Sequence, residues 1–253
     1  MIRSKNIIGL IPAAGKGLRM GLPFPKELFP ILINQKYQPV AQFAVEKILQ
    51  TGVKHIVFVI NEAKTQLINY FKDGKNYECQ FSYVFQNSLD AIDQISKSPG
   101  LAHAIDSAYH LIQNKTVFFC MADTIIIPRD AMKNAYNERK YNSDIILCLF
   151  KTNQPENYGM VEIGECGEKI TKIIDKPQST ALEWMWGCII WKPIFSEFLH
   201  NQIQIHKIFD FASILNKAID QGFRFSPYKI HDGQFIDIGN TDICNLLSQI
   251  NIK

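Results

Sequence analysis

Cationic side chains and small residues stand close together near the start of the sequence. The stretch Ala13–Gly17 reads AAGKG, and Arg19 and Lys26 follow shortly after it. Glycines and alanines let backbone N–H groups approach a phosphate chain closely, and nearby cations balance its charge. The apolar run Ile7–Ile11 comes directly before, so the stretch lies where a strand gives way to a loop. These residues suit an anion-binding loop, and a glycine turn with solvated cations is the alternative that they leave open.

Two common phosphate-binding motifs do not fit this loop. A P-loop requires GxxxxGK[ST], which is absent here. A dinucleotide fingerprint requires GxGxxG, but Met20 stands where its last glycine belongs, and Gln35 to Tyr37 stand where an acidic ribose ligand belongs. Taken alone, the GKG stretch is therefore best interpreted as a glycine turn with solvated Lys and Arg.

Two aspartates follow apolar runs in opposite halves of the sequence. Asp123 ends the run VFFCMAD, where an unpaired carboxylate would be costly, so we expect it to be a ligand. Asp237 lies in FIDIG, where a turn-forming role and a ligand role are equally open.

Apolar, β-rich runs alternate with helical patterns through residues 1–150. The expected strands are Ile7–Ile11, His55–Ile60, Phe81–Phe85, Val117–Met121 and Asp144–Phe150. The expected helices are Val40–Gln50, Lys64–Phe71, Ala102–Ile112 and Arg129–Arg139. Such alternation predicts an α/β fold with a largely parallel sheet, helices on both faces and ligands beyond the carboxyl ends of the strands.

Residues 151–253 are richer in short strands. The expected strands are Tyr158–Ile163, Ile170–Asp175, Met185–Trp191, Arg224–Lys229 and Gln234–Ile238, with helices at Lys207–Gln221 and Thr241–Ile250. No linker separates the two parts, so we expect a single domain over 1–253, with a nucleotide-binding half at 1–150 and a substrate-shaping half at 151–253.

Composition narrows the class of protein. The 253 residues are 47% hydrophobic and 20% charged, and the net charge of +3 gives no sign of a nucleic-acid surface. No stretch approaches the length of a membrane span. The six cysteines are well separated and lack metal-ligand spacing, so we expect reduced thiols in a cytoplasmic protein.

The stretch AAGKGLRM…PKELFP resembles the signature of the sugar-phosphate nucleotidylyltransferases, the family of glucose-1-phosphate thymidylyl- and uridylyltransferases. Further landmarks follow in the family's order: Gln86, GLAHA from Gly100, VFFCMAD with Asp123, ENYGMVEI with Tyr158 and Gly159, IIDKP with Asp175 and Lys176, WMWGCIIW with Gly187, and FIDIGN with Asp237. The resemblance implies a three-layer, Rossmann-like nucleotidyltransferase fold around a predominantly parallel, mixed sheet.

The resemblance also implies a reaction. Family members join an NTP and a sugar 1-phosphate into an NDP-sugar and release pyrophosphate, with Mg²⁺ assisting in-line attack on the α-phosphate. The sugar phosphate is largely a dianion at neutral pH, so no general base is needed. The absence of a Ser-His-Asp or Cys-His arrangement agrees with that chemistry.

Roles carry over to matching positions. Arg19, Lys26 and Asp123 would be catalytic, with Arg19 on the departing pyrophosphate and Lys26 on the α-phosphate. Asp123 and Asp237 would hold Mg²⁺. The nucleotide would contact Ala13, Ala14, Gly15, Gly17, Arg19, Lys26, Gln86, Gly100 and Asp123, with Gln86 and Gly100 favouring a pyrimidine. The sugar phosphate would contact Tyr158, Gly159, Asp175, Lys176 and Gly187, with Lys176 on its phosphate.

Several positions depart from the family pattern. Leu18 replaces a usual Thr, Asp175 replaces a usual Glu, and the segment between Gln86 and Gly100 is long. The phosphate-binding Arg before the late helix is missing, and His206 or Lys207 is the nearest substitute. The short spacing from Arg19 to Lys26 leaves a cytidylyltransferase acting on a non-sugar alcohol phosphate as an alternative. A catalytically silent nucleotide-sugar-binding protein is the second alternative, and the oligomeric state is not predicted.

Overall fold

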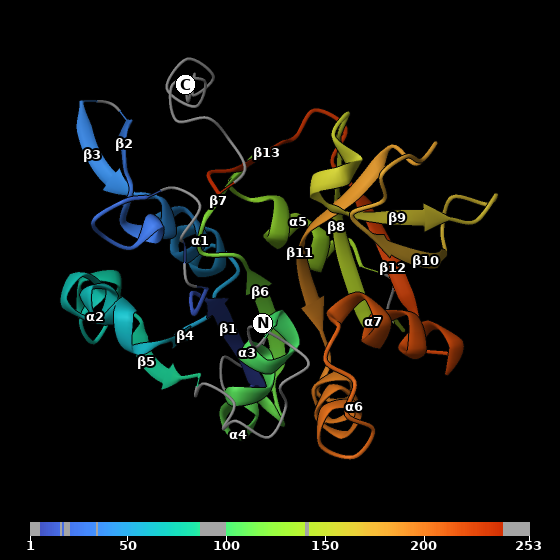
Figure 1. The fold of residues 1–253 in the computed structure, drawn as a ribbon, viewed down its shortest axis with the longest axis horizontal. Helices are drawn as coiled ribbons and strands as arrows, with labels where there is room; N and C mark the ends of the chain where they lie inside the picture. Colours follow the sequence, from blue (N-terminus) through green and yellow to red (C-terminus); the bar gives the residue numbers. More distant parts are fainter. Residues whose placement is uncertain are drawn as a thin grey trace.

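Among the described residues, nine strands form the main sheet, and it joins the two halves of the chain (Figure 1). The computed structural model describes residues 6–15, 17, 21–33, 35–86, 100–139 and 142–239. The strand order is β10-β9-β11-β6-β1-β4-β5, and β8 pairs with β11 and β12. These strands are β1 Ile7–Pro12, β4 His55–Ile60, β5 Gln80–Phe85, β6 Thr116–Cys120, β8 Ile145–Lys151, β9 Gly159–Ile163, β10 Ile170–Asp175, β11 Trp184–Trp191 and β12 Phe225–Lys229.

The front half of the sheet is parallel. Strand β1 pairs in parallel with β4 and β6, and β4 pairs in parallel with β5. Strand β1 is buried along its whole length, as its unbroken apolar sequence requires at the centre of a parallel sheet. The carboxyl ends of these four strands therefore meet at one edge. The back half attaches through β11, which is antiparallel to β6 and β8, and the expected mixed α/β sheet is confirmed.

Helices cover both faces of the sheet. Apolar side chains of α1 (Val40–Leu49), α2 (Thr65–Phe71) and α5 (Ala131–Asn137) pack in the core on one face. The other face is covered by α3 (Leu101–Ser107), α4 (Tyr109–Ile112), α6 (Pro193–Gln204) and α7 (Phe211–Asp220). The result is a helix–sheet–helix sandwich, in agreement with the expected three layers.

Two short antiparallel ribbons stand beside the main sheet. Strand β2 (Pro30–Ile33) pairs with β3 (Lys36–Pro39), and β7 (Thr124–Ile127) pairs with β13 (Gln234–Asp237). Apolar residues of both ribbons pack with α1 in a third, smaller core. The second ribbon matters most for the site, because it places Asp237 opposite Thr124 and so beside the end of β6.

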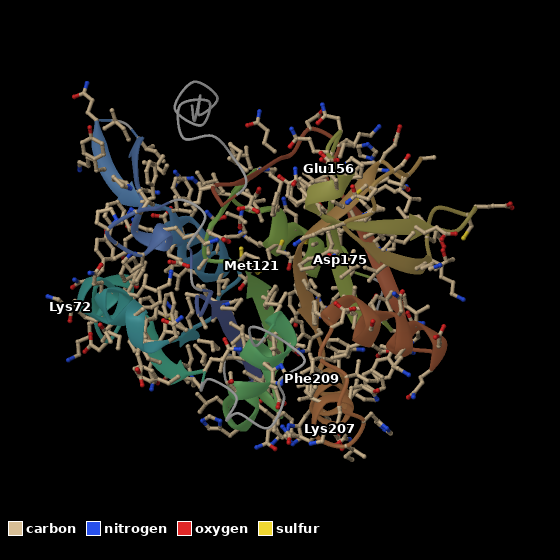
Figure 2. The ribbon with its side chains drawn as sticks, in the orientation of Figure 1. Lys72, Met121, Glu156, Asp175, Lys207 and Phe209 are labelled. Carbon is tan, nitrogen blue, oxygen red and sulfur yellow. The ribbon has the colours of Figure 1, made fainter. Side chains whose placement is uncertain are left out.

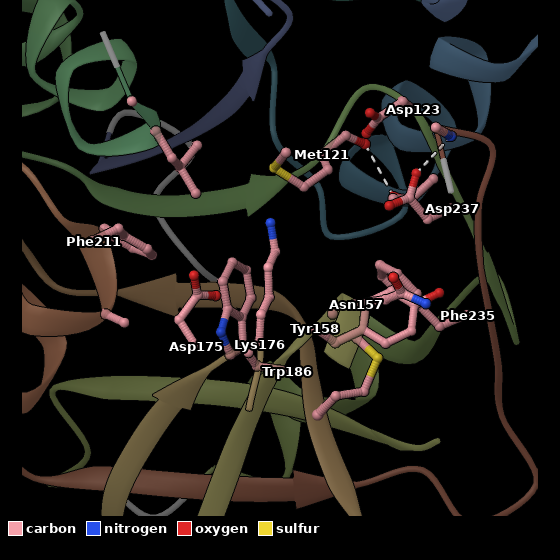
Figure 3. A pocket seen from close by; sticks show the side chains of 18 of the residues that line it. Met121, Asp123, Asn157, Tyr158, Asp175, Lys176, Trp186, Phe211, Phe235 and Asp237 are labelled. Carbon is pink, nitrogen blue, oxygen red and sulfur yellow. Dashed lines mark hydrogen bonds between the residues drawn. The ribbon is translucent and has the colours of Figure 1, made fainter. Parts of the chain in front are cut away.

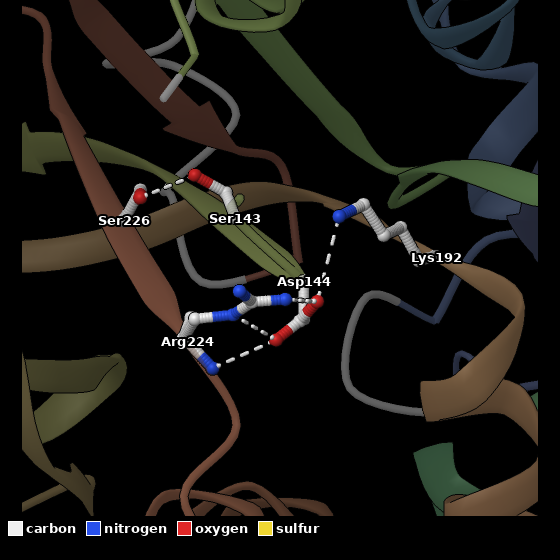
Figure 4. A network of polar contacts seen from close by, with 5 residues as sticks. All are labelled: Ser143, Asp144, Lys192, Arg224 and Ser226. Atoms are coloured by element: carbon white, nitrogen blue, oxygen red, sulfur yellow. Dashed lines mark hydrogen bonds and ion pairs between the residues drawn. The ribbon is translucent and has the colours of Figure 1, made fainter. Parts of the chain in front are cut away.

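A polar network ties the start of β8 to the start of β12 (Figure 4). Arg224 donates to both carboxylate oxygens of Asp144, from Nε at 2.8 Å and Nη2 at 2.9 Å. Lys192 Nζ lies 3.4 Å from the same carboxylate, and the hydroxyls of Ser143 and Ser226 are 2.6 Å apart. This network stabilises the join between two strands far from each other in the sequence.

Several elements differ from the sequence-based expectations. Helix α6 and strands β2, β3 and β7 were not expected. Helix α7 begins at Phe211 rather than Lys207, because the Asp210 side chain caps it by accepting from the Ser213 N–H at 2.7 Å. The expected helix Thr241–Ile250 lies outside the described residues. Within the described ranges, no helix is long and apolar enough to cross a membrane.

Candidate active site

Two adjoining cavities lie at the carboxyl edge of the parallel strands. The larger has a volume of about 400 Å³ and the smaller about 180 Å³. Both are lined by Lys26, Gly100, Leu101, Met121 and Asp123. A ligand that fills both cavities must therefore pass Lys26 and Asp123.

The smaller cavity is bordered by the expected anion-binding loop. Pro12 ends β1, and the residues from Pro12 to Gly15 line the cavity together with Gln86, which follows β5. The Ala13 N–H donates to the Val59 carbonyl at 2.7 Å, which fixes the start of the loop to β4. Gly17 has φ = +65°, a conformation that glycine adopts without strain. Backbone and small side chains thus leave room for a ligand here.

Lys26, Asp123 and Asp237 converge between the cavities. Lys26 Nζ forms an ion pair with Asp123. A Cβ atom on Gly239 would lie 2.9 Å from Lys26 Nζ, 3.1 Å from Asp237 Oδ1 and 3.7 Å from Asp123 Oδ2. All three charged groups therefore face one small volume, which the missing side chain of Gly239 leaves open. The Gly239 N–H donates to Asp237 Oδ1 at 2.7 Å and orients this carboxylate.

The electrostatics of this cluster keep Lys26 charged. Burial lowers its pKa, but Asp123 and then Asp237 outweigh that effect, so the pKa lies above its ordinary value. Burial, reinforced by the charge of Asp237, raises the pKa of Tyr158 to about 12. Near neutral pH the cluster accordingly presents an ammonium group and a protonated phenol.

The larger cavity extends from this cluster to the antiparallel half of the sheet. Figure 3 shows Asp123 and Asp237 at one end, and Asp175, Lys176 and Trp186 at the other. Asp175 ends β10, and Lys176 follows with φ = 45°. The carboxylate of Asp175 and the ammonium group of Lys176 thus form part of the wall that an incoming substrate would contact.

Glycines shape that wall. A Cβ on Gly159 would lie 3.0 Å from Trp186 Cδ1, so the indole ring can lie against bare backbone. A Cβ on Gly187 would lie 2.7 Å from Phe150 and Phe235 ring atoms. The Trp186 ring lines the cavity.

Nearly all of the expected site residues are brought together. Ala13, Ala14, Gly15, Gln86 and Gly100 line the smaller cavity; Gly100, Tyr158, Gly159, Asp175, Lys176, Gly187 and Asp237 line the larger; Lys26 and Asp123 line both. Gly17 adjoins Lys26, since its Cβ would lie 3.7 Å from Lys26 Cγ. Arg19 lies outside the described residues.

The suggested substitutes for the missing arginine are not at the site. His206 and Lys207 are exposed, and Lys207 lies by the end of α6, well away from Met121 and Asp175 (Figure 2). The chain turns there, because Lys207 has φ = 55° and α7 starts only at Phe211. The residues between α6 and α7 that line the cavity are instead Phe209 and Asp210, together with Phe211 at the start of α7.

Other lining residues were not expected from the sequence. Among them are Asn157, Phe209, Asp210, Phe211, Phe235 and Gly239 at the larger cavity and Glu27 at the smaller. Gly239 stood in the matched FIDIGN motif and could have been found there. The aromatic residues gave no signal, because apolar residues next to a helix or in a strand ordinarily pack in the core.

The donor set limits what metal the site could hold. Within the part of the chain that the structure describes, no group of three or more His, Cys, Asp or Glu side chains forms a metal site. Asp123 and Asp237 offer two carboxylates within 3.7 Å of a single point. Hard oxygen ligands of this kind suit Mg²⁺, which commonly takes one or two carboxylates and completes its shell with phosphate and water.

Curated relatives carry sugar-phosphate transferase names. A UTP–glucose-1-phosphate uridylyltransferase of Synechocystis is 24% identical over 240 residues, which cover 91% of this chain and 59% of the relative. UTP–glucose-1-phosphate uridylyltransferase 1 of Staphylococcus saprophyticus is 27% identical over 218 residues, covering 76% of this chain and 74% of the relative. This chain therefore spans a little over half the length of the Synechocystis protein.

Solved structures share the fold. A UDP-glucose pyrophosphorylase from Acinetobacter baumannii matches with a TM-score of 0.72 and 15% identity, over 92% of this chain and 89% of that one. Another UDP-glucose pyrophosphorylase matches with a TM-score of 0.72 and 23% identity, over 96% of both chains. The family model described as Nucleotidyl transferase matches residues 8–245. Because this match covers most of the chain, the chain belongs to the nucleotidyl transferase family.

Proposed function

We propose that this protein joins an NTP to a sugar 1-phosphate, giving an NDP-sugar and pyrophosphate. The observation that carries the proposal is the position of Lys26 and Asp123 between two cavities. The smaller cavity, with its glycine loop and Gln86, suits a nucleotide. The larger, with Asp175 and Lys176, suits a phosphorylated sugar, since carboxylates accept from hydroxyl groups and ammonium groups bind phosphate.

The reaction requires positioning and charge compensation. A phosphate oxygen of the sugar 1-phosphate attacks the α-phosphorus, a new P–O bond forms, and the bond to the departing pyrophosphate breaks. Two unit charges 4 Å apart repel by about 4 kcal/mol at an effective dielectric of 20, so cations are needed at the α-phosphate. Lys26 supplies one and Lys176 holds the attacking phosphate, while Arg19 is assigned to the pyrophosphate by the family pattern.

Mg²⁺ is the proposed cofactor, held by Asp123 and Asp237. Lys26 offsets only one of the two carboxylates that face one point, and the triphosphate would add further negative charge there. The ion would neutralise charge on the phosphates as the transfer proceeds. The chain's own contribution is to orient Asp237 through the Gly239 N–H and Asp123 through its strand-end position.

The proposed nucleotide is a pyrimidine. Gln86 lines the smaller cavity, and its Nε2 lies 3.4 Å from the Gly100 carbonyl. Its amide offers both a donor and an acceptor to a base edge. The UTP named for the relatives agrees with that choice.

The setting of the protein is also a proposal. We infer a single domain over 1–253, since strand β11 joins the two halves in one sheet. Cys79, Cys120, Cys148, Cys166 and Cys188 are free thiols, which suits the reducing cytoplasm.

Pyrophosphate release, measured across four NTPs and a panel of sugar 1-phosphates with Mg²⁺, tests the proposal. Turnover with a pyrimidine NTP and one sugar 1-phosphate is expected. Activity only with an alcohol phosphate would replace the sugar assignment with the cytidylyltransferase alternative. Nucleotide binding without turnover of any acceptor would indicate a silent binding protein, and a clear preference for ATP or GTP would overturn the base assignment.

A further inference from the structure

A second lysine–carboxylate pair, Lys64 with Glu27, lies next to Lys26. Lys64 Nζ and Glu27 Oε2 are 2.5 Å apart, and their side chains are only 3% and 2% exposed. Glu27 is the next residue after Lys26, in the short 3-10 helix Lys26–Leu28. Lys64 ends the 3-10 helix Glu62–Lys64, which follows β4. The pair therefore joins the Lys26 segment to the main sheet.

The turn that carries Lys64 also holds the other side of the loop. Asn61 Nδ2 donates to the Ala14 carbonyl at 2.5 Å, while Asn61 Oδ1 accepts from the Ala63 N–H at 2.9 Å. Lys64 Nζ lies 3.5 Å from where a Cβ on Gly17 would be. The turn that follows β4 thus contacts Ala14, lies beside Gly17 and pairs with Glu27.

A stability role alone is a poor account of this pair. Desolvating two charges is expensive, and an apolar pair of similar volume often serves a protein as well or better. Burial raises the pKa of Glu27, and Lys64 opposes that shift. Unlike apolar packing, the ion pair is directional, because it holds the Glu27 carboxylate at a fixed distance from the Lys64 ammonium group.

We propose that Lys64 and Glu27 are positioning residues, which hold Lys26 at Asp123 and keep the loop at Gly17 open for the phosphates. The inference rests on the proposed transfer reaction, in which Lys26 contacts the α-phosphate. Lys64 lines neither cavity, and the Glu27 side chain, at the border of the smaller cavity, is only 2% exposed and is paired with Lys64. Their effect passes through the placement of Lys26.

The chain provides a matched control. Lys47 on α1 is also 2% exposed, but its Nζ donates to the Ile126 carbonyl at 3.0 Å, and it lines neither cavity. Lys64→Met and Lys47→Met each remove a buried ammonium group and keep an unbranched side chain. We expect Lys64→Met to lower kcat at least tenfold with an unchanged KM for the sugar 1-phosphate, and Lys47→Met to leave kcat within twofold. Equal effects of the two variants on kcat, at similar losses of Tm, would overturn the proposal.

A double variant tests the route of the effect. If Lys64 acts through Lys26, then Lys64→Met added to Lys26→Ala should cause no further loss of kcat, although the Tm still falls. Losses that multiply would show a separate role and overturn the proposal. Glu27→Gln keeps the shape and an acceptor for Lys64, so it should fold if Lys64→Met does not, and it should lower kcat less than Lys64→Met.

A binding measurement separates this inference from the proposed reaction. If the wild-type protein shows no turnover with any NTP and acceptor, the proposed reaction is wrong. The positioning role is then tested by the rise in Tm that a nucleotide causes. That rise should be at least halved in Lys64→Met and retained in Lys47→Met. An equal rise in both variants would overturn the positioning role, whatever the turnover of the wild type.

Discussion

Two groups of charged residues beside the main sheet, around Asp144 and around Asp123, differ in their balance of charge. Asp144 accepts from Arg224 Nε, Arg224 Nη2 and the Arg224 N–H, and Lys192 lies 3.4 Å away. The single carboxylate of Asp144 thus interacts with two cations, Arg224 and Lys192. At the cavities, two carboxylates face one small volume, and Lys26 is the cation that the described residues place between them. The Asp144 cluster is complete as a structural join, whereas the Asp123 cluster has the charge to accept a further cation.

The largest expected effect comes from neutralising the cavity carboxylates. Asp123→Asn and Asp237→Asn should each lower kcat/KM at least a hundredfold, about 2.7 kcal/mol of transition-state stabilisation, because an amide is a weak ligand for Mg²⁺. Turnover across a Mg²⁺ titration measures the loss, with circular dichroism as the folding control. Full wild-type activity in EDTA, or near-normal activity of either variant, would remove the metal or that carboxylate from the reaction.

Removing the cation between these carboxylates should have the next largest effect. We expect Lys26→Ala to lower kcat/KM about thirtyfold, near 2 kcal/mol, because a charge-assisted contact to the α-phosphate is lost. Its Tm should change little, since the two carboxylates lie at an open cavity. A kcat/KM within about threefold of wild type, under roughly 0.7 kcal/mol, would contradict the assignment.

Filling the volume at Gly239 should have a smaller effect. In Gly239→Ala the new Cβ would lie 2.9 Å from Lys26 Nζ and 3.1 Å from Asp237 Oδ1, so both groups must move by tenths of an ångström. Because the lysine end is flexible, we expect only about a fivefold loss of kcat, near 1 kcal/mol. Gly164→Ala is the matched control, since its Cβ would meet Thr171 Cγ2 at an ordinary 3.5 Å. Equal kcat values for the two variants would show that the open volume is not used.

The smallest effect on turnover is expected at the complete cluster. Asp144→Asn should leave kcat unchanged and lower Tm by about 3 °C at neutral pH, near 1 kcal/mol for a chain of this size. The hydrogen bond from Arg224 lowers the pKa of Asp144, so the unfolded chain binds this proton more tightly. The stabilisation is present above about pH 4 and is lost as the pH falls through the lowered pKa. The Tm difference should therefore shrink in acid, and a constant difference would contradict this account.

Local patterns in the sequence located most of the fold. Strands β4 and β10 begin and end at the expected residues, because apolar periodicity and flanking polar residues define both. Strand β7 was not expected, since it follows β6 after only three residues and its partner β13 is more than 100 residues away. Helix α6 carries an apolar stripe at Phe195, Leu199 and Ile203, but it begins at Pro193 without a capping side chain.

The candidate site was predictable as far as its motifs extend. Lys26, Asp123 and Asp237 were assigned by resemblance, and they meet at Gly239. The pairing of Glu27 with Lys64 spans 37 positions and follows no motif, so it could not be read from spacing. The same holds for Phe209 and Phe211, whose place in the cavity depends on how α6 turns into α7.

The ribbon of β7 and β13 can form only late in the synthesis of residues 1–239, because its two strands are far apart in the sequence. Asp123 is synthesised 114 residues before Asp237, which at 5–20 residues per second is an interval of about 6 to 23 seconds. During that interval the parallel strands and the glycine loop can fold, but β7 has no partner strand and the second carboxylate does not yet exist. On a ribosome, the parallel strands are thus made before the second carboxylate of the proposed metal site. The two carboxylates can therefore meet only after residue 237 has been made.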